Sequence, residues 1–526
     1  QPNRVMIWTD TFANNKQSDI FNTELVENNA RLAELNRQDI RVIVGNPPYS
    51  VGQESQNDDN QNEHYDELDA RLTATYVAHT DSTLKGKLYD SYIRAYRWAS
   101  DRIGQKGVIG FVTNAGWLET SSADGMRKCM TEEFNSIYIY HLKGNQRTSG
   151  ERSRQEGGKV FGEGSRAPAA IVFLIKNPES TDHGKIYFHA VDDYLTREEK
   201  LAALKKDRSI AYTPMNVIVP DAHGDWFNQR DDSYSRLMRM DGKKTEEKAI
   251  FKNFSLGVGT NRDVWAYASS KSSIEDKLRK CIKFYNQEVE KKKQDSNYIF
   301  SKDLTKISWI HPQRIGFEKL IKSNLFDKNK IHPAAYRPYI RQYLYFDRFW
   351  NNRVYQMPSI FPMNTTDNLV ICSSGVDNLV ICINQNAKDA GQISLMTNYI
   401  ADLHFNGDTQ CFPRWLPGEQ PKTAVGELFG DQNQMPSGFS PEALPHFQAA
   451  YPDQSITEDD LFYYIYGILH SEDYRTRYAN NLMKELPRIP RVATHEQFMA
   501  FVEAGQELAR LHVHFEDVTP YAGVTV

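Results

Sequence analysis

The residues best suited to chemistry follow one short apolar run. Residues 41–45 are rich in β-branched side chains and predict a buried strand, and Asn46-Pro47-Pro48-Tyr49 comes directly after it. Because neither proline can donate a hydrogen bond to a neighbouring strand, the strand must end and a rigid loop must begin. The Asn46 side-chain oxygen and the Pro47 carbonyl can accept the two hydrogens of a planar amino group, and Tyr49 can stack on the ring that carries it.

A structural Pro-Pro turn after a core strand would use the same two prolines. In an open parallel α/β sheet, however, ligands bind at the carboxyl ends of the strands. Asn46 and Tyr49 accompany the prolines at that edge, so the motif favours the handling of an amino group over a plain turn.

The composition is that of an ordinary globular protein. The 526 residues are 40% hydrophobic and 25% charged, which is enough chain for roughly two to four domains. The net charge of −5 means that any contact with nucleic acid must come from a local basic patch. The five cysteines form no CxxC pair, which argues against a disulfide framework or a zinc ribbon. No apolar run approaches the ~18 residues of a membrane span, so we expect no membrane partner. The scattered cysteines fit a reducing cytoplasm, and we expect chemistry that needs no metal.

Strand and helix patterns alternate in the first part of the chain. After a helical stretch before residue 41, the patterns predict a helix over 88–103, a strand over 107–113, a helix over 124–134, and strands over 137–142 and 169–175. Two successive strands at the end fit a doubly wound sheet finished by an antiparallel hairpin. Near the N-terminus, Asp10 and Phe12 follow a strand-like run over residues 5–8 and could receive a cofactor adenine; a helix cap at Asp10 is the alternative.

Two stretches are rich in cations. Residues 143–168 carry six cations against three acids, as expected of a flexible loop near phosphates or of a solvated loop, and contain Arg147, Arg152 and Arg154. Residues 330–355 interleave eight aromatic residues with five cations, among them Arg337, Arg341, Arg348 and Arg353. This second stretch predicts a cationic face toward DNA, with Arg337 and Arg341 on one side of a strand if one strand holds both. A half-buried aromatic strand pair with arginines covering the ring edges explains the same residues.

These motifs resemble those of one enzyme family. The Asn-Pro-Pro-Tyr sequence is similar to that of the amino-methyltransferases that use S-adenosyl-L-methionine, and most closely to the adenine-specific DNA enzymes. Residues 46–50, 88–94, 107–114, 124–127 and 157–162 look like the γ-type adenine methyltransferase of the single-polypeptide Type I-like (Type ISP) restriction-modification enzymes. Residues 463–470 and 484–490 look like the C-terminal specificity region of that family.

The resemblance implies roles for particular residues. Asn46, Pro47, Pro48 and Tyr49 would form the catalytic loop, Phe161 would clamp the flipped base opposite Tyr49, and Asp10, Phe12 and Asn46 would bind the cofactor. Arg262 lies in a Gly-Thr-Asn-Arg sequence that resembles the start of the target-recognition domains of related restriction enzymes; a Gly-rich turn is the alternative. The implied partner of Arg262 and of the arginines in the two basic stretches is double-stranded DNA.

The implied fold class is α/β. It comprises a Rossmann-like doubly wound methyltransferase sheet lacking its N-terminal strands, an α+β target-recognition domain and a helical C-terminus. The expected bounds are 1–190 for the methyltransferase part, 191–250 for a connector, 251–420 for target recognition and 421–526 for the helical part.

Residues 1–45 contain neither the Gly-rich cofactor loop nor the acidic ribose-binding residue that the family places before its Asn-Pro-Pro-Tyr strand. We therefore expect a piece of a longer polypeptide that is inactive when isolated. Upstream helicase and nuclease domains would use ATP and Mg²⁺.

The implied reaction moves a methyl group from S-adenosyl-L-methionine to the exocyclic amine of an adenine flipped out of duplex DNA. Two alternatives remain open at this point. One is amino-methylation of RNA or of a protein glutamine, against which the large second half argues. The other is a non-catalytic DNA-binding fragment, which binding of the cofactor would exclude.

Overall fold

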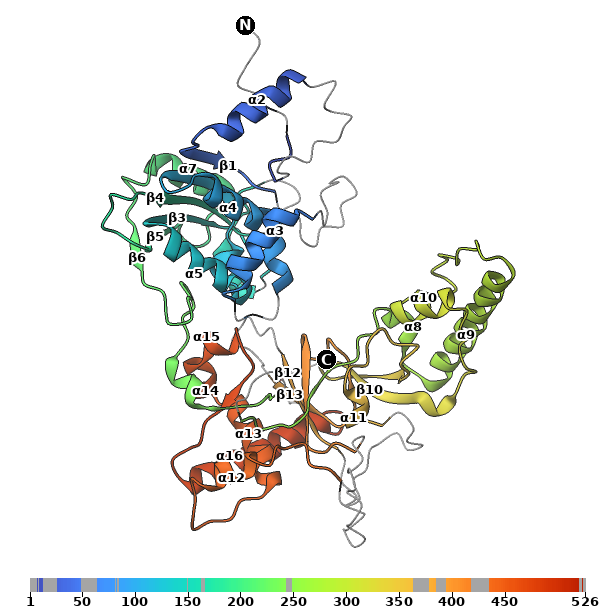
Figure 1. The fold of residues 1–526 in the computed structure, drawn as a ribbon. Coiled ribbons are helices and arrows are strands. Elements are labelled where there is room, and N and C mark those ends of the chain that lie inside the picture. The colour runs from blue at the N-terminus through green and yellow to red at the C-terminus, as the bar shows by residue number, and fades with distance from the viewer. Residues whose placement is uncertain are drawn as a thin grey trace, which may run out of the picture. The chain divides into compact units, whose positions relative to one another are not determined.

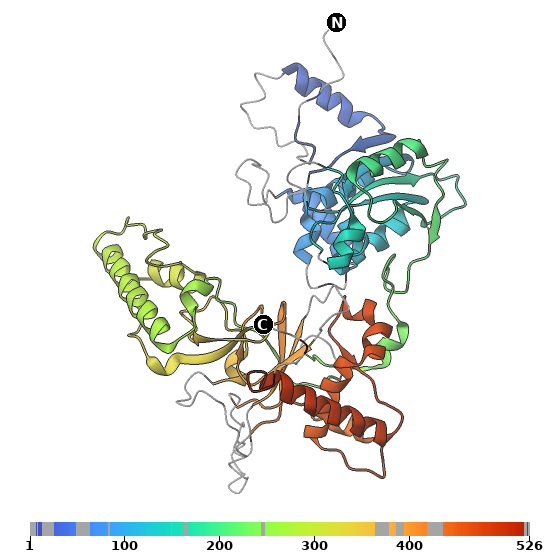
Figure 2. The same ribbon diagram turned by 180° about the vertical axis from the view of Figure 1, so that it is seen from behind.

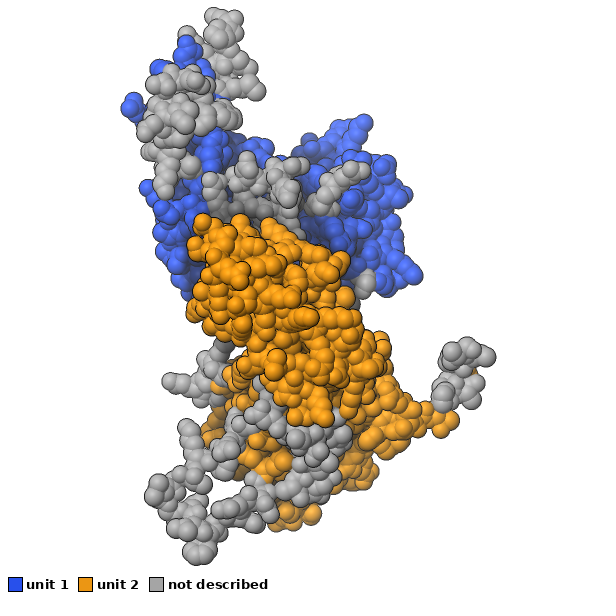
Figure 3. Space-filling model, turned by 90° about the vertical axis from the view of Figure 1, so that its right-hand side faces the viewer, with its two compact units in different colours: residues 1–230 blue, residues 231–526 orange. Residues whose placement is uncertain are grey.

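A computed structural model describes the chain as two compact units, residues 1–230 and 231–526 (Figure 3). The described residues are 7, 9–12, 26–48, 64–80, 82, 85–148, 150–161, 166–242, 248–362, 378–384, 394–417, 435–519 and 523. Tyr49 and residues 5, 6 and 8 of the N-terminal strand-like run lie outside this set. No described helix is both long enough and apolar enough to cross a membrane.

The first unit is an α/β unit built on one mixed sheet (Figure 1). In chain order its α-helices and strands are α2 (Val26–Arg37), β1 (Val42–Gly45), α3 (Asp66–Leu72), α4 (Ser91–Arg102), β2 (Gly107–Asn114), α5 (Asp124–Glu133), β3 (Ser136–Lys143), α6 (Gly150–Glu156), β4 (Ala169–Lys176), β5 (Lys185–Ala190), α7 (Arg197–Asp207) and β6 (Asn216–Ile218).

The strands lie in the order β1-β2-β4-β3-β5-β6. β1 and β2 run parallel, with Gly45 opposite Phe111, so both end at the same edge of the sheet. β4 lies between β2 and β3 and is antiparallel to both. The expected antiparallel hairpin of β3 and β4 is therefore confirmed, and its second strand is inserted into the sheet rather than added at its border.

β1 differs from the buried strand that the sequence predicts. Val42 is 63% exposed and Val44 is 78% exposed, whereas Ile43 packs against the core of the unit. The reason is position: within the described part of the chain β1 pairs with β2 alone, so it forms the edge of the sheet and only one of its faces is covered.

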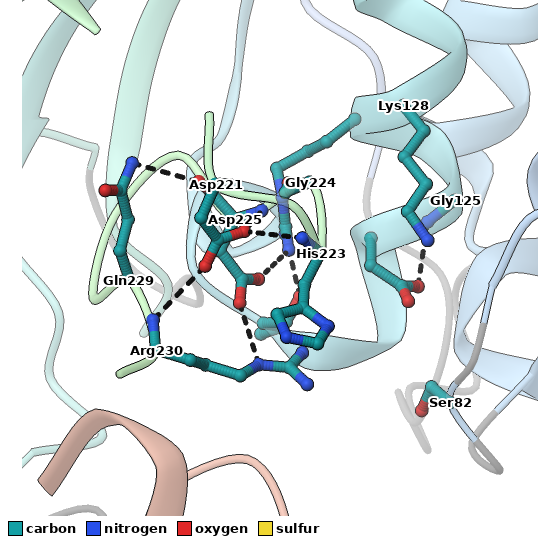
Figure 4. A network of polar contacts seen from close by, with 12 residues as sticks. Ser82, Gly125, Lys128, Asp221, His223, Gly224, Asp225, Gln229 and Arg230 are labelled. Atoms are coloured by element: carbon teal, nitrogen blue, oxygen red, sulfur yellow. Dashed lines mark hydrogen bonds and ion pairs between the residues drawn. The ribbon is translucent and has the colours of Figure 1, made fainter. Parts of the chain in front are cut away.

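Residues 191–230 belong to the first unit, whereas the sequence analysis treated them as part of a connector. β6 extends the sheet by pairing with β5, and the buried Trp226 packs edge-on against Trp117 at 5.3 Å. The Asp225 carboxylate pairs with Arg127 of α5 at 2.9 Å, in the polar network drawn in Figure 4. The boundary between units falls instead at Arg230 and Asp231.

The described residues of the second unit form three small sheets and several helices. Its elements are β7 (Met238–Arg239), β8 (Ser255–Leu256), α8 (Asp263–Ala266), β9 (Tyr267–Ala268), α9 (Lys271–Gln294), α10 (His311–Glu318), β10 (Ile331–Arg337), β11 (Ile340–Tyr345), α11 (Met357–Ile360), β12 (Val380–Asn384), β13 (Ser394–Thr397), β14 (Ile400–Ala401), β15 (Thr409–Pro413), α12 (Ala443–Gln448), α13 (Glu458–His470), α14 (Glu472–Arg477), α15 (Ala479–Leu482), β16 (Arg488–Ile489) and α16 (His495–Val513). The sheet orders are β14-β10-β11-β9, β13-β12-β15-β8 and β16-β7.

The C-terminal helices share a core with the sheets of this unit. Ile381 of β12 and Phe412 of β15 lie in the same buried cluster as Tyr464 and Phe498, so residues 251–420 and 421–526 are not separated as the sequence analysis expected. Both ribbon views show α13 and α16 side by side (Figures 1 and 2). A Cβ atom on Gly467 would lie 2.3 Å from the Phe501 carbonyl oxygen, so only glycine permits this close approach.

Candidate functional site

The Asn46-Pro47-Pro48 segment leaves the carboxyl end of β1. Pro47 is buried, whereas Asn46 and Pro48 are exposed, so the proline ring fixes the loop while the amide faces outward. Gly45 lies beside Phe111 of β2, where a Cβ atom would be in ordinary contact with the ring at 3.4 Å. At the end of the neighbouring strand, the Asn114 side chain accepts a hydrogen bond from the Gly116 amide at 2.8 Å. The edge where β1 and β2 end therefore presents one exposed amide on a well-supported loop.

Asp10 and Phe12 form a small turn beside Tyr65. Asp10 accepts hydrogen bonds from the Phe12 amide at 3.0 Å and from the Tyr65 hydroxyl at 3.1 Å. The rings of Phe12 and Tyr65 meet edge to face at 5.4 Å, and Phe12 also packs against the core of the first unit. The carboxylate and the ring that the sequence assigned to a cofactor adenine thus lie together, with Tyr65 as a third member.

Tyr65 is held in turn by a buried ion pair. Arg94 donates two hydrogen bonds to Asp69, at 2.8 and 2.9 Å, and Asp69 accepts the Tyr65 amide at 3.2 Å. The Arg94 guanidinium also lies 5.4 Å from the Tyr65 ring. Sequence reasoning missed Tyr65 because a long polar segment precedes it, although the aromatic and basic residues of 88–94 were a signal that this region contributes to the site.

The described residues between β3 and β4 include a short helix, whereas the glycines of this segment predict a flexible loop. This helix is α6, where Arg152 pairs with Glu119 at 3.3 Å and Arg154 with Glu151 at 3.1 Å. Arg147 is exposed. Phe161 is half-buried and packs against a small cluster that includes Val160. Of the three candidate arginines, Arg147 is the one whose side chain is exposed and forms no ion pair within the described residues.

Arg262 is buried, which differs from its expected place at a DNA surface. Its guanidinium donates to the carbonyl oxygens of Ser308 and Trp350, at 3.3 and 2.7 Å, and to Gln313 Oε1 at 3.3 Å. Burial lowers the pKa of Arg262 to about 10. The side chain therefore ties its own loop to two distant segments, one of which leads into the turn that carries Arg348 and Arg353.

Arg337 and Arg341 do not lie on one strand. Arg337 ends β10 and Arg341 belongs to β11, because the chain turns at Pro338 and Tyr339. Arg337 pairs with Asp402 at 2.7 Å and with Asp263 at 3.1 Å. It lies 4.0 Å from the Tyr336 ring, as in the half-buried aromatic alternative.

Arg341 is also held inside the unit. It pairs with Glu516 at 2.9 Å and covers the rings of Tyr399 and Phe515 at 4.6 and 4.9 Å. Both arginines therefore stabilise the second unit in this structure.

Arg348 and Arg353 are exposed, and neither side chain forms an ion pair within the described residues. The backbone of Arg353 exchanges two hydrogen bonds with Gly259, each 2.9 Å long. Arg353 thus lies beside the loop that Arg262 fixes. Of the four arginines in the second basic stretch, Arg348 and Arg353 are available to an external anion.

Replacing Arg337 with alanine should destabilise the second unit by about 1–3 kcal/mol, because it removes charged hydrogen bonds from two carboxylates. Asp402 is buried and, among the described residues, would keep the Tyr267 hydroxyl and the His404 backbone amide as donors, each at 2.8 Å. Thermal unfolding is the measurement, with Arg510→Ala, which removes an exposed ion pair, as the control. An unchanged melting temperature together with weaker DNA binding would instead place Arg337 at the DNA.

The fold and this constellation define a protein of the DNA restriction-modification class, as comparison with known proteins shows. A family model described as the Eco57I restriction-modification methylase matches residues 4–147. A model described as the Type ISP C-terminal specificity domain matches residues 249–526. The chain belongs to the Type ISP restriction-modification family, which confirms the family resemblance seen in the sequence. A search of curated proteins finds no match.

Solved structures agree with this membership. A nuclease-deletion mutant of the Type ISP enzyme LlaGI, in complex with a DNA substrate mimic, is 34% identical with a TM-score of 0.79 over 99% of this chain. The ATP-dependent Type ISP enzyme LlaBIII bound to DNA is 31% identical, with a TM-score of 0.82 over 99% of this chain. DrdV, in a DNA complex, is 35% identical, with a TM-score of 0.76 over 94%. The chain spans 39% of the length of the LlaGI deletion mutant, 32% of that of LlaBIII and 46% of that of DrdV.

Proposed function

We propose that this chain supplies the methyl-transfer and target-recognition functions of a Type ISP enzyme that methylates the exocyclic amine of adenine in duplex DNA. The observation that carries the proposal is the exposed Asn46 amide, held at the carboxyl edge of β1 in a unit that matches a restriction-modification methylase. The sheet order β1-β2-β4-β3, with β4 reversed, supports a Rossmann-like methyltransferase sheet.

Each residue of the catalytic loop has a physical task in this reaction. The Asn46 oxygen and the Pro47 carbonyl accept the two amine hydrogens, which turns the nitrogen lone pair toward the methyl donor and stabilises positive charge as it develops on nitrogen. Pro48 keeps the loop rigid. Tyr49 and Phe161 would stack on opposite faces of the extruded base, which offsets the loss of stacking within the duplex.

The residues near Asp10 fit the adenine part of S-adenosyl-L-methionine. Each carboxylate oxygen of Asp10 accepts one hydrogen bond from the protein, so acceptor capacity remains for an adenine amine. Phe12 and Tyr65 add apolar ring surface. S-Adenosyl-L-methionine, when bound, supplies the methyl group; Asp10, Phe12 and Asn46 would orient it toward the amine. ATP-dependent translocation and DNA cleavage are assigned to other parts of the full-length enzyme.

Arg348 and Arg353 are proposed to contact DNA from the second unit, and Arg147 from the first. In the full-length enzyme, Arg348→Ala combined with Arg353→Ala should weaken DNA binding by about 10-fold or more, because an arginine on a base edge contributes roughly 1–3 kcal/mol. The unfolding temperature should not change, since both side chains are exposed.

Titration of binding against salt separates the two kinds of contact. Loss confined to the cognate sequence indicates base readout, and uniform loss with a salt slope reduced by about 1 per arginine indicates phosphate contact. Unchanged affinity for every sequence would remove this turn from the interface. Arg510→Ala, at an exposed position of the same unit, is the matched control.

A further inference from the structure

Lys200 of α7 is a fully buried lysine that forms no ion pair with any carboxylate in the part of the chain that the structure describes. Its ammonium group donates to the backbone carbonyl oxygens of Glu156 and Gly158, at 2.7 and 2.6 Å. Lysine is seldom fully buried unless it is paired, because removing its charge from water is costly. Burial lowers the pKa of Lys200 to about 8; the charge of Glu156 opposes this shift and that of Lys143 adds to it. Because burying this ammonium group costs free energy, the segments that its two hydrogen bonds hold in place are of interest.

The two hydrogen bonds of Lys200 hold the turn that leads into Phe161. Residues at the start of α7 form hydrogen bonds with the same turn. The Gly158 amide donates to the Leu195 carbonyl at 2.9 Å, and Arg197 Nε donates to the Val160 carbonyl at 2.9 Å. Gly157 has a φ of +64°, and a Cβ atom there would lie 2.3 Å from the Leu195 oxygen. The turn therefore packs directly against the start of α7, and there is no space for a side chain at Gly157.

The start of α7, which contacts this turn, is itself held in place. Thr196 and Glu199 form a reciprocal capping box that starts α7, and Glu156 receives the backbone amides of Gly144 and Asn145 at 3.0 Å each. The segment that follows β3 and the segment that precedes Phe161 therefore meet beside Lys200. A shift of this junction would move the half-buried ring of Phe161 relative to the sheet edge.

We propose that Lys200, assisted by Arg197, is a positioning residue that fixes the turn before Phe161 so that this ring can stack on the extruded base. The inference rests on the proposed function. It requires that Lys200 contribute to capture of the target base and not to affinity for DNA, because its ammonium group is occupied inside the first unit. Misplacing a reacting group by about 1 Å can cost on the order of 100-fold in rate, so a modest movement of the turn is sufficient.

The test uses the full-length enzyme and two duplexes of the same sequence: one in which 2-aminopurine replaces the adenine that the enzyme methylates, for the fluorescence, and one that keeps this adenine, for kcat and KM. Lys200→Met keeps a similar side-chain length but removes the donors, and it should reduce both the fluorescence rise on binding and kcat by about 10- to 100-fold. KM for DNA should stay within about twofold. Lys205→Met, at an exposed position on the same helix, is the control and should resemble the wild type.

A double-mutant comparison separates positioning from general damage. If Lys200 acts through Phe161, then Phe161→Ala and the double variant Lys200→Met, Phe161→Ala should show the same loss, because the two residues act as one unit. Additive losses would overturn the inference. If Lys200→Met fails to fold, Arg197→Met decides: its side chain is exposed, and a smaller loss of the same signal supports the inference whereas no change overturns it.

The outcome also distinguishes this inference from the proposed function. A wild-type enzyme that neither raises the 2-aminopurine signal nor methylates DNA would contradict the proposed function itself. A wild type and a Phe161→Ala variant that behave as expected, beside a Lys200→Met variant with normal signal, would contradict the positioning role alone.

Discussion

Asn46→Ala in the full-length enzyme is expected to lower methyl transfer by about 10²–10³-fold or more, the cost of removing one preorganised polar group from a reacting centre. The amide is exposed at the edge of the sheet, and no described contact makes it part of the core, so the fold should be preserved. Transfer of labelled methyl groups to DNA is the measurement. Asn36→Ala, an exposed position on α2, is the matched control.

Binding of DNA should change by no more than about twofold in the Asn46 variant, because phosphate contacts elsewhere provide most of the affinity. A loss of turnover without a loss of DNA affinity would assign Asn46 to the extruded base. A variant with near-normal turnover would remove the Asn-Pro-Pro-Tyr loop from the active site. Equal losses of binding and turnover would point to a damaged fold instead.

Asp225→Ala is expected to destabilise the first unit by about 3–5 kcal/mol, because it leaves the buried Arg127 without its counter-ion. Arg127 is fully buried; it donates to the carbonyl oxygens of Trp117, Thr120 and Gly224, and it pairs with Asp225 at 2.9 Å. Asp225 also pairs with Arg230 at 3.0 Å (Figure 4). Burial lowers the pKa of Arg127, and the charge of Asp225 opposes that shift.

Denaturant unfolding of the first unit measures this effect. Asp192→Ala, which changes an exposed acid of the same unit, should alter stability by less than about 0.5 kcal/mol. A loss below about 1 kcal/mol for Asp225→Ala would mean that the ion pair contributes little to the stability of the first unit.

The regular elements of the first unit were accessible from the sequence because their signals are local. The strand predicted over 107–113 is found as Gly107–Asn114, and the one predicted over 137–142 as Ser136–Lys143. Apolar periodicity fixes such segments. The exposure of β1 was not accessible in this way, because a β-branched run is equally compatible with an edge strand and a central one, and its neighbours decide.

The burial and the bonding partners of the arginines depend on residues far along the chain. Arg262 lies in a Gly-rich stretch that is typical of a surface turn, but the hydrogen-bond acceptors of its guanidinium come from residues 308, 313 and 350. For Arg337 and Arg341 a local signal did exist: Pro338 cannot donate to a ladder, and it marks the end of β10. Thr196 and Glu199 have the spacing of a capping box, which is a local signal for the start of a helix, but nothing local shows that Lys200 reaches the turn before Phe161.

The most direct test of the central claim is to map N6-methyladenine in DNA incubated with the full-length enzyme and S-adenosyl-L-methionine. We expect methylation of one defined adenine in a single recognition sequence, lost in Asn46→Ala and retained in Asn36→Ala. Methyl groups found only in RNA or protein, or DNA in which no adenine is modified although the cofactor binds, would contradict the central claim.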